Sequence, residues 1–158
     1  MNFSLDRIDF AILELLQENG RLTNKEIAAA VGLAPSSCFE RVKRLTQDGA
    51  IRGFHAEVAA EALGIHLQAM VAIQLKQHSR ELVEAFYDHV LTLPEVVAVY
   101  HVAGRQDFMV HVVVRDTDHL RNLAMDAFTT RPEVAHLETS LIYAATRKHG
   151  LPRLSWDS

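Results

Sequence analysis

Residues 23–49, TNKEIAAAVGLAPSSCFERVKRLTQDG, contain the start and stop signals of two helices joined by a tight turn. Thr23 and Glu26 have the spacing of a capping box, and a glycine follows the first helix, as it often does at helix ends. Pro35 suits the first position of the second helix, because an N–H at that position would have no partner within the helix. Two helices at this spacing predict a helix-turn-helix.

The flanking segments extend this N-terminal unit. In residues 5–20, the apolar side chains that recur at helical spacing are Ile8, Ile12, Leu15 and Leu16. This period predicts a further amphipathic helix. Residues 51–58, IRGFHAEV, favour a short strand or wing. We therefore expect a winged helix-turn-helix domain over residues 1–60.

The helix expected over residues 35–48 has two different faces. Projection at about 100° per residue places small and apolar side chains on one stripe, formed by Ala34, Pro35, Cys38, Val42 and Leu45. The opposite side carries Ser36, Ser37, Glu40, Lys43, Arg44 and Gln47, with Arg41 at the edge of the stripe. The only cysteine therefore faces inward, where packing is a more usual role than redox sensing or metal ligation.

Positive charge gathers around this helix although the formal net charge of the chain is -4. Residues 21–53 hold six Lys and Arg against three Asp and Glu, a local balance of +3. In a DNA-binding unit the two serines can approach the edges of nucleobases or the phosphates, and Arg41 can reach a guanine. The other basic side chains can neutralise phosphates. A solvated face of a packing module is the alternative. The candidate DNA contacts are Lys25, Ser36, Ser37, Glu40, Arg41, Lys43 and Arg44.

After about residue 60 the pattern changes to β-favouring runs that alternate with amphipathic helices. Two helices begin near Ser79 and Thr117, and four strands are expected at residues 67–76, 96–104, 108–116 and 136–144. The order βαββαβ indicates a ferredoxin-like sandwich and an α+β fold class. The expected domains are therefore residues 1–60 and 61–150, followed by a tail at 151–158.

Both faces of the expected sheet carry apolar residues. Strict alternation places Val97 and Val99 on one face, and the other face then receives Val96, Ala98 and Val102. Because the helices of such a sandwich cover only one face, the other would expose an apolar patch, and such patches usually mark interfaces. We expect a dimer through the uncovered face.

Three stretches carry a family resemblance. LDRIDFAILELLQENGR and VGLAPSSCFERVKRL resemble the N-terminal domain of the Lrp/AsnC (leucine-responsive, feast/famine) regulators of prokaryotic transcription, and HVAGRQDFMVHV resembles a turn of their effector domain. Ala34 replaces a serine that is frequent in the family, so one possible helix cap is lost. The resemblance covers the chain except about residues 151–158. It implies a sequence-specific DNA-binding transcriptional regulator that responds to an amino acid or a related small molecule.

The resemblance also implies dimers that assemble further into tetramers or octamers, with the effector bound between subunits. Gly104 would permit close backbone approach, and Asp107 could accept a hydrogen bond from an α-ammonium group. An ordinary hairpin turn is the alternative interpretation. The other candidate effector residues are Arg105, Phe108, Thr139 and Ser140.

Other functions have less support. The sequence has no Gly-rich phosphate loop, HExxH or GxSxG motif, so we expect neither an enzyme nor a cofactor. His101 and His111, expected close to register on adjoining strands, could begin a metal site, but no further ligands are apparent and no metal is expected. These histidines could instead confer pH sensitivity at an interface. A ligand sensor that has lost DNA binding is a third alternative, against which the basic helix argues.

The cellular setting follows from cysteine content and hydropathy. One cysteine cannot form an internal disulfide, and no apolar run approaches the roughly 18 residues of a membrane span. We therefore expect a cytoplasmic protein whose partners are double-stranded DNA, a small-molecule effector and further copies of the chain, with no membrane association.

Overall fold

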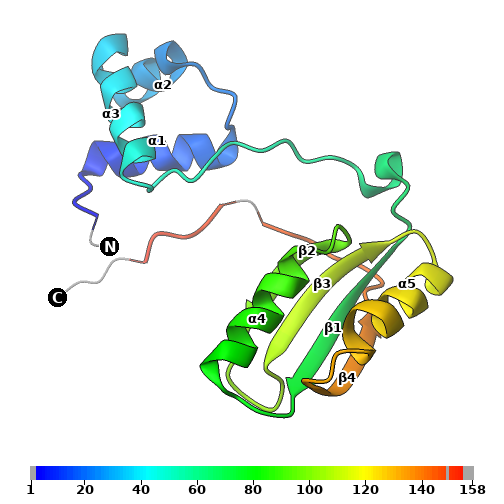
Figure 1. Ribbon diagram of the computed structural model, residues 1–158. Helices are drawn as coiled ribbons and strands as arrows, with labels where there is room; N and C mark the ends of the chain where they lie inside the picture. Colours follow the sequence, from blue (N-terminus) through cyan, green and yellow to red (C-terminus); the bar gives the residue numbers. More distant parts are fainter. Residues whose placement is uncertain (1–2, 149, 155–158) are drawn as a thin grey trace. The chain divides into compact units, whose positions relative to one another are not determined.

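The computed structural model describes residues 3–148 and 150–154. The chain divides into two compact units (Figure 1). One comprises the residues up to Glu57 together with the segment from Thr146, and the other comprises Val58–Ala145. The segment from Thr146 thus groups with the N-terminal unit, whereas the sequence placed the second boundary at residue 150.

The first unit contains three helices, α1 (Arg7–Glu18), α2 (Asn24–Val31) and α3 (Pro35–Gln47). The capping box of Thr23 and Glu26 is present as predicted, and α1 begins with a second capping box that the sequence analysis had not identified. The inward stripe of α3 helps form a core whose buried members are Ile12, Ile27, Ala28, Cys38, Leu45 and Ile51. Cys38 is fully buried as expected, and burial raises the pKa of its thiol.

Two local expectations for this unit have clear outcomes. Ala34 provides no side-chain cap for α3, as its replacement of a serine predicted. Residues 51–58, for which a short strand or wing was expected, form no strand. A strand is defined by ladder partners, and no ladder of the described residues includes this segment.

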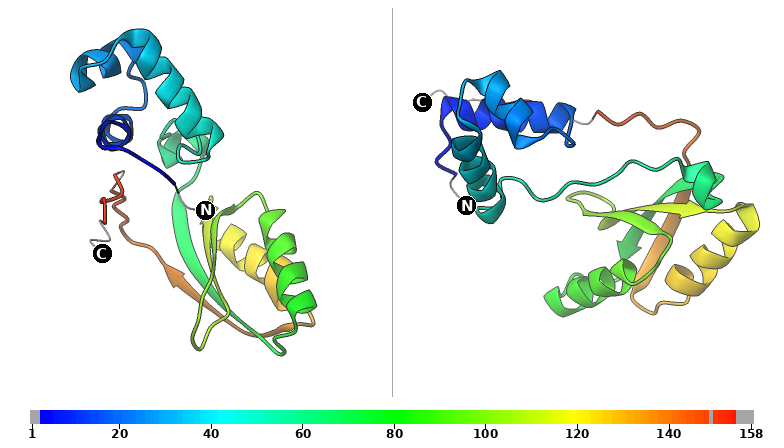
Figure 2. Two further views of the ribbon diagram at one scale, coloured as in Figure 1. Left: turned by 90° about the vertical axis from the view of Figure 1, so that its left-hand side faces the viewer. Right: turned by 90° about the horizontal axis from the view of Figure 1, so that it is seen from above.

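The second unit is a four-stranded antiparallel sheet covered by helices on one face (Figures 1 and 2). The strands are β1 (Leu67–Leu75), β2 (Val96–His101), β3 (Phe108–Val114) and β4 (Val134–Leu141), in the order β2-β3-β1-β4. The helices are α4 (Arg80–Leu91), α5 (Thr117–Leu123), the short η1 (Ala60–Leu63) and the π-helical η2 (Ala124–Thr129). This βαββαβ arrangement is the ferredoxin-like sandwich that the sequence predicted.

Alternate residues of the two central strands fill the layer between sheet and helices. In β1 and β3 these are Ala69, Val71, Ile73, Leu75, Phe108, Val110, Val112 and Val114, all buried. From the helices, Phe86 and Phe128 are among the largest side chains in the same core. The period of two residues along both strands therefore decides which side chains face the helices.

Several expected element ends differ from the structure. Asp116, not Thr117, caps α5. The helix expected from near Thr117 continues past α5 into η2, where the backbone changes to π-helical bonding. Strands β2, β3 and β4 end at His101, Val114 and Leu141, earlier than predicted.

The expected face assignment of β2 is wrong because the strand contains a bulge. Val96 lies opposite Val112 in β3, but the next paired residue is Ala98, opposite His111. The bulge removes Val97 from the ladder, so Val96 and Val99 share the helix-facing side and Val97 is exposed. A bulge adds one residue to one strand and shifts the alternation beyond it.

The face of the sheet away from the helices is mixed rather than uniformly apolar. Gln68 and His111 place polar side chains on it, and the Nε2 atom of His111 lies 3.0 Å from the Oε1 atom of Gln68. Its apolar members in register are Met70, Ala72, Ala98, Tyr100, Met109 and Val113. Most of these are only partly buried in the single chain, and Tyr100 is exposed.

Candidate functional site

The outward face of α3 is open to solvent. Five of the seven candidate DNA contacts lie on α3 and α2 with exposed side chains, namely Lys25, Ser36, Ser37, Glu40 and Lys43. Pro35 starts the helix, so the backbone N–H groups of its first turn and the two serines are at the same exposed end. Phe39, two residues after Ser37, is 49% exposed and was not predicted as a contact. This face offers hydroxyls, one ammonium group and an aromatic ring to a partner.

The two arginines of α3 are held by the start of α1. Nη1 of Arg41 lies 2.7 Å from Oδ2 of Asp6 and 2.8 Å from Oδ1 of Asp9. Nη2 of Arg44 lies 2.6 Å from the other carboxylate oxygen of Asp9. One carboxylate therefore bridges both guanidinium groups. In the free protein, both arginines predicted to contact DNA are therefore already paired with carboxylates of α1.

Asp9 is the centre of this cluster and is almost fully buried, with 1% of its surface exposed. Burial acts to raise its pKa, but the backbone N–H of Asp6 and the guanidinium groups of Arg41 and Arg44 outweigh burial and lower it. The pKa of Asp6 is also lowered, mainly by the backbone N–H of Asp9 and by Arg41. Both carboxylates are therefore ionised at neutral pH, and they connect α1 to α3.

The two arginines differ in how much of each side chain remains available. Arg41 is 28% exposed and pairs with two carboxylates, whereas Arg44 is 48% exposed and pairs with one. A guanidinium group has five N–H donors, so Arg44 keeps donors that can face an anion outside the protein. The structure thus favours a packing role for Arg41 and leaves a contact role for Arg44.

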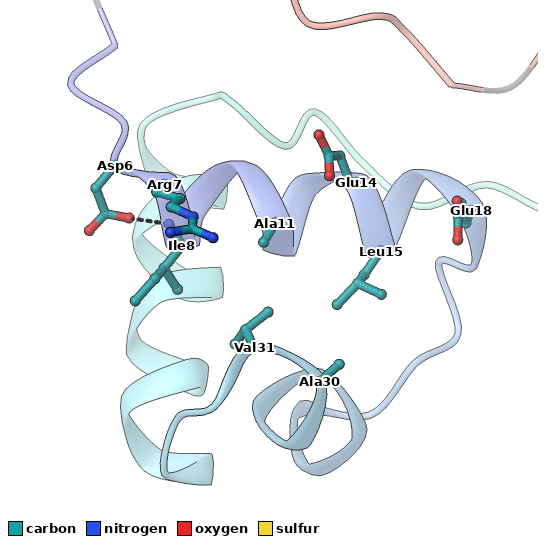
Figure 3. A pocket seen from close by; sticks show the side chains of 9 residues that line it. All are labelled: Asp6, Arg7, Ile8, Ala11, Glu14, Leu15, Glu18, Ala30 and Val31. Carbon is teal, nitrogen blue, oxygen red and sulfur yellow. Dashed lines mark hydrogen bonds between the residues drawn. The ribbon is translucent and has the colours of Figure 1, made fainter.

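A hollow of about 770 Å³ lies beside this cluster, between α1 and α2 (Figure 3). Its apolar lining is Ile8, Ala11, Leu15, Ala30 and Val31. The charged residues around it are Asp6, Arg7, Glu14 and Glu18, so acidic groups predominate. None of the seven candidate DNA contacts lines it. A hollow of this charge is poorly suited to phosphate.

In the second unit, the turn between β2 and β3 is fixed by Asp107. Its Oδ2 atom accepts a hydrogen bond of 2.7 Å from the backbone N–H of Leu75, and its Oδ1 atom lies 2.9 Å from Nδ1 of His78. The backbone N–H of Asp107 also donates to the carbonyl oxygen of Ile73 at 2.9 Å. The predicted partner of an effector ammonium group thus already joins the turn to the end of β1.

Other residues of the turn have different environments. Gly104 has φ 138°, a conformation that a residue with a Cβ atom rarely adopts, and Arg105 is exposed. The Oε1 atom of Gln106 is shielded from solvent and accepts no hydrogen bond among the described residues. Sequence reasoning missed this glutamine, because a turn residue gives no sign of burial. Buried acceptors are usually satisfied, so this oxygen is a candidate acceptor for a bound ligand.

Phe108 packs in the core and also forms the floor of a hollow of about 530 Å³. His101 stacks on its ring with the centroids 4.9 Å apart. The remaining lining residues come from α4 and β2 and are Val83, Glu84, Tyr87, Asp88 and Val99. A small molecule beside the β2–β3 turn would meet aromatic rings and carboxylates here.

Within one chain, the candidate effector residues form two separate groups. Asp107 and Phe108 contact the Ile73 end of β1 on its β3 side. Thr139 and Ser140 belong to β4, on the other side of β1, where they pair with Val71 and Met70. Neighbouring residues of a strand also point to opposite faces. The single chain therefore does not bring Thr139 and Ser140 to the turn.

Two family models match the two units described above. Residues 5–52 match a winged helix-turn-helix DNA-binding domain, and residues 68–152 match the Lrp/AsnC ligand-binding domain. The chain belongs to the Lrp/AsnC family. It is a transcriptional regulator with a DNA-binding domain and a ligand-binding domain.

Relatives of this Lrp/AsnC regulator agree with the assignment. The HTH-type transcriptional regulator AldR of Mycolicibacterium smegmatis is 41% identical over 90% of this chain and 84% of its own length. The crystal structure of a transcriptional regulator from Neisseria meningitidis in complex with L-Met is 29% identical, with a TM-score of 0.87 over 94% of this chain and 97% of that one. E. coli AsnC gives 26% identity and a TM-score of 0.84 over 94% and 99%. These relatives are regulators, so the expectation of a non-enzyme is confirmed.

In this Lrp/AsnC regulator, the register of β2 and β3 shows that the expected pairing of His101 with His111 is wrong. His101 lies opposite Phe108 in the ladder, while His111 lies opposite Ala98, so the two histidines are not cross-strand neighbours. No group of three or more potential metal ligands occurs among the residues that the structure describes. Within the same residues, no helix has the length and hydropathy to cross a membrane.

Proposed function

We propose that this Lrp/AsnC regulator reads duplex DNA with the outward face of α3 and that an amino acid or related small molecule at the β2–β3 turn changes this binding. The observation that carries the first part is the exposed face formed by Ser36, Ser37 and Lys43 at the start and middle of a helix supported by α2. Short hydroxyl side chains at the start of a recognition helix permit close approach to bases. Lys25, Glu40, Arg41 and Arg44 complete the proposed interface. Because its partner is DNA, we place the protein in the cytoplasm.

The charge of the face predicts how DNA binding depends on salt. Each phosphate neutralised by a basic side chain contributes about 0.9 to the slope of log affinity against log salt. Lys43→Ala should therefore weaken binding to all duplexes and reduce the slope by about one. Arg80→Ala, which removes a charge of the same sign from an 84% exposed side chain of α4, serves as the matched control. Fluorescence anisotropy with fragments of the protein's own promoter region, over a salt series, tests this.

The effector part rests on the turn rather than on Asp107 alone. Asp107 positions the turn, and the unpaired Oε1 atom of Gln106 offers an acceptor to the ammonium group of a ligand. The L-Met complex of the Neisseria meningitidis regulator supports the class of effector. Thermal-shift measurements with the twenty amino acids test it, because a ligand that binds only the folded state raises the melting temperature. A screen without any shift would contradict an amino-acid effector and leave the DNA-binding proposal intact.

We also propose that copies of the chain associate through the uncovered sheet face into a dimer, and further into a tetramer or octamer. Thr139 and Ser140 lie away from the turn of their own chain, so a neighbouring copy would have to supply them if they contact the effector. Two α3 helices of a dimer can reach successive major grooves about 34 Å apart. Light scattering after size exclusion measures the assembly. Met109→Asp, in the centre of the uncovered face, should shift it to a smaller species, and a monomeric wild type would contradict the proposal.

A further inference from the structure

The C-terminal segment Gly150–Leu154 lies along α1. The backbone N–H of Leu151 donates a hydrogen bond of 2.6 Å to Oε1 of Gln17. The guanidinium carbon of Arg153 lies 3.9 Å from the centroid of the Phe10 ring. Two different kinds of contact, one to the backbone and one to a side chain, therefore attach the same short segment to one helix.

The positions of these contacts give the direction of the segment. Gln17 and Phe10 are seven residues apart on α1, about two helical turns, so they lie on the same flank. Leu151 contacts the later residue and Arg153 the earlier one. The segment therefore runs antiparallel to α1.

Charge and ring geometry favour this contact. Residues 146–154 contain Arg147, Lys148 and Arg153 and no acidic residue. Helix α1 contains three acidic residues against one basic residue. Glu14 and Glu18 project from α1 away from Ala30 and Val31 of α2 (Figure 3). An arginine over an aromatic face also gains a cation–π attraction, which is specific for a cation. The flank of α1 thus suits a basic, extended segment.

We propose that residues 150–154 are a strap that docks on the flank of α1 in the same chain and restrains the DNA-binding unit. The strap follows β4, which ends at Leu141, so the first unit is attached to the sheet unit by two chain segments instead of one. Phe10, which receives Arg153, is the neighbour in sequence of Asp9, which holds both arginines of α3. The strap thereby stabilises the helix that positions α3. This last consequence rests on the proposed DNA-binding function.

Hydrogen exchange followed by mass spectrometry on the full chain tests the docking without reference to DNA. In the wild type the amides of residues 150–154 should exchange at least several-fold more slowly than an unstructured peptide. Gln17→Ala and Arg153→Ala should each abolish this protection, because each removes one side chain of the contact. Arg147→Ala removes the same charge from an exposed position that precedes the strap and should keep the protection. Exchange of the wild-type segment at the rate of an unstructured peptide would overturn the strap.

A cysteine pair tests whether the strap belongs to the same chain. Gln17→Cys with Leu151→Cys should form a disulfide within one chain, visible as a fast-migrating monomer on a non-reducing gel, whereas a covalent dimer would show an exchange between copies and contradict the proposal. Gln47→Cys with Leu151→Cys is the control pair and should not cross-link. Cys38 can remain, because it is buried.

DNA affinity tests whether the strap restrains the DNA-binding unit. Arg153→Ala should lower the affinity for a promoter fragment at least threefold more than Arg147→Ala, because a unit held at two points loses less freedom on binding DNA. Equal losses would overturn this consequence. If neither the wild type nor the variants bound DNA, the proposed function would fail, while hydrogen exchange would still decide whether the strap exists.

Discussion

The carboxylate of Asp9 is shared between Arg41 and Arg44, with one oxygen 2.8 Å from a nitrogen of the former and the other 2.6 Å from a nitrogen of the latter. The carboxylate is buried, whereas both guanidinium groups reach solvent. One residue at the start of α1 therefore holds two side chains of the helix that we propose reads DNA. We therefore expect a change at Asp9 to affect both the stability of the domain and the proposed contact with DNA.

Asp9→Asn should lower the free energy of unfolding of the DNA-binding domain by about 2 kcal/mol, since it removes a buried charge that accepts several hydrogen bonds. Urea denaturation measures the change. Asp118→Asn, which removes a carboxylate that is 80% exposed and 3.4 Å from Arg121, is the control and should cost less than about 0.5 kcal/mol. Equal effects of the two substitutions would contradict the bridging role of Asp9.

Acid should weaken the same cluster. The pKa of Asp9 in the folded protein lies below its ordinary value of 3.8, so its ionised form stabilises the fold above that value. This stabilisation is lost as the pH falls below about 4 toward the folded-state pKa. The difference in unfolding free energy between the wild type and Asp9→Asn should therefore be larger at pH 6 than at pH 3.5, as measured by urea denaturation. A difference that stays the same at both pH values would exclude this contribution.

Arg41 and Arg44 should separate stability from DNA binding. Arg41→Ala removes both of its ion pairs and should destabilise the domain by about 1–2 kcal/mol, with a smaller effect on DNA affinity. Arg44→Ala should weaken binding to all duplex sequences, because the more exposed guanidinium group keeps free donors for phosphate. Urea denaturation and anisotropy on both variants provide the comparison. The reverse order of the two effects would assign the DNA contact to Arg41.

The outline of the fold could be predicted because it depends on local signals. The capping box at Thr23 and the inward position of Cys38 follow from spacing within one helix. The pairing of Asp9 with Arg44 could not be predicted, since 35 residues separate the partners and an acidic residue in a first helical turn is usually explained by the helix dipole. The bulge at Val97 gave no signal either, because valine suits a regular strand equally well.

The candidate effector site shows the same division between local and distant information. The conformation of Gly104 and the turn itself were accessible from a short motif. The attachment of Asp107 to Leu75 was not, because it depends on which strand lies beside the turn. The separation of Thr139 from the turn likewise depends on strand order, in which β1 lies between β3 and β4. Strand order is a property of the whole sheet.

Asp107→Ala should loosen the β2–β3 turn by leaving the N–H of Leu75 without its acceptor. We expect a loss of about 1–2 kcal/mol in the unfolding free energy of the second unit, measured by thermal or urea denaturation. Asp107→Asn keeps a carbonyl oxygen in the same place and should restore most of the loss. If the asparagine variant is as unstable as the alanine variant, the contact with His78 rather than the hydrogen bond to Leu75 holds the turn.

Gly104→Ala tests whether the shape of the turn depends on glycine. A Cβ atom added at Gly104 would meet no atom within 4 Å, so any cost comes from the backbone, whose φ of 138° is unfavourable for alanine. The expected loss is about 1–3 kcal/mol in the unfolding free energy, measured by thermal denaturation. Gly150→Ala is the matched control, because a Cβ atom there also has free space and its φ lies outside the left-handed region. Similar stability of the two variants would mean that the turn adopts another conformation in solution, and the arrangement of Gly104 and Gln106 as an effector site would lose its support.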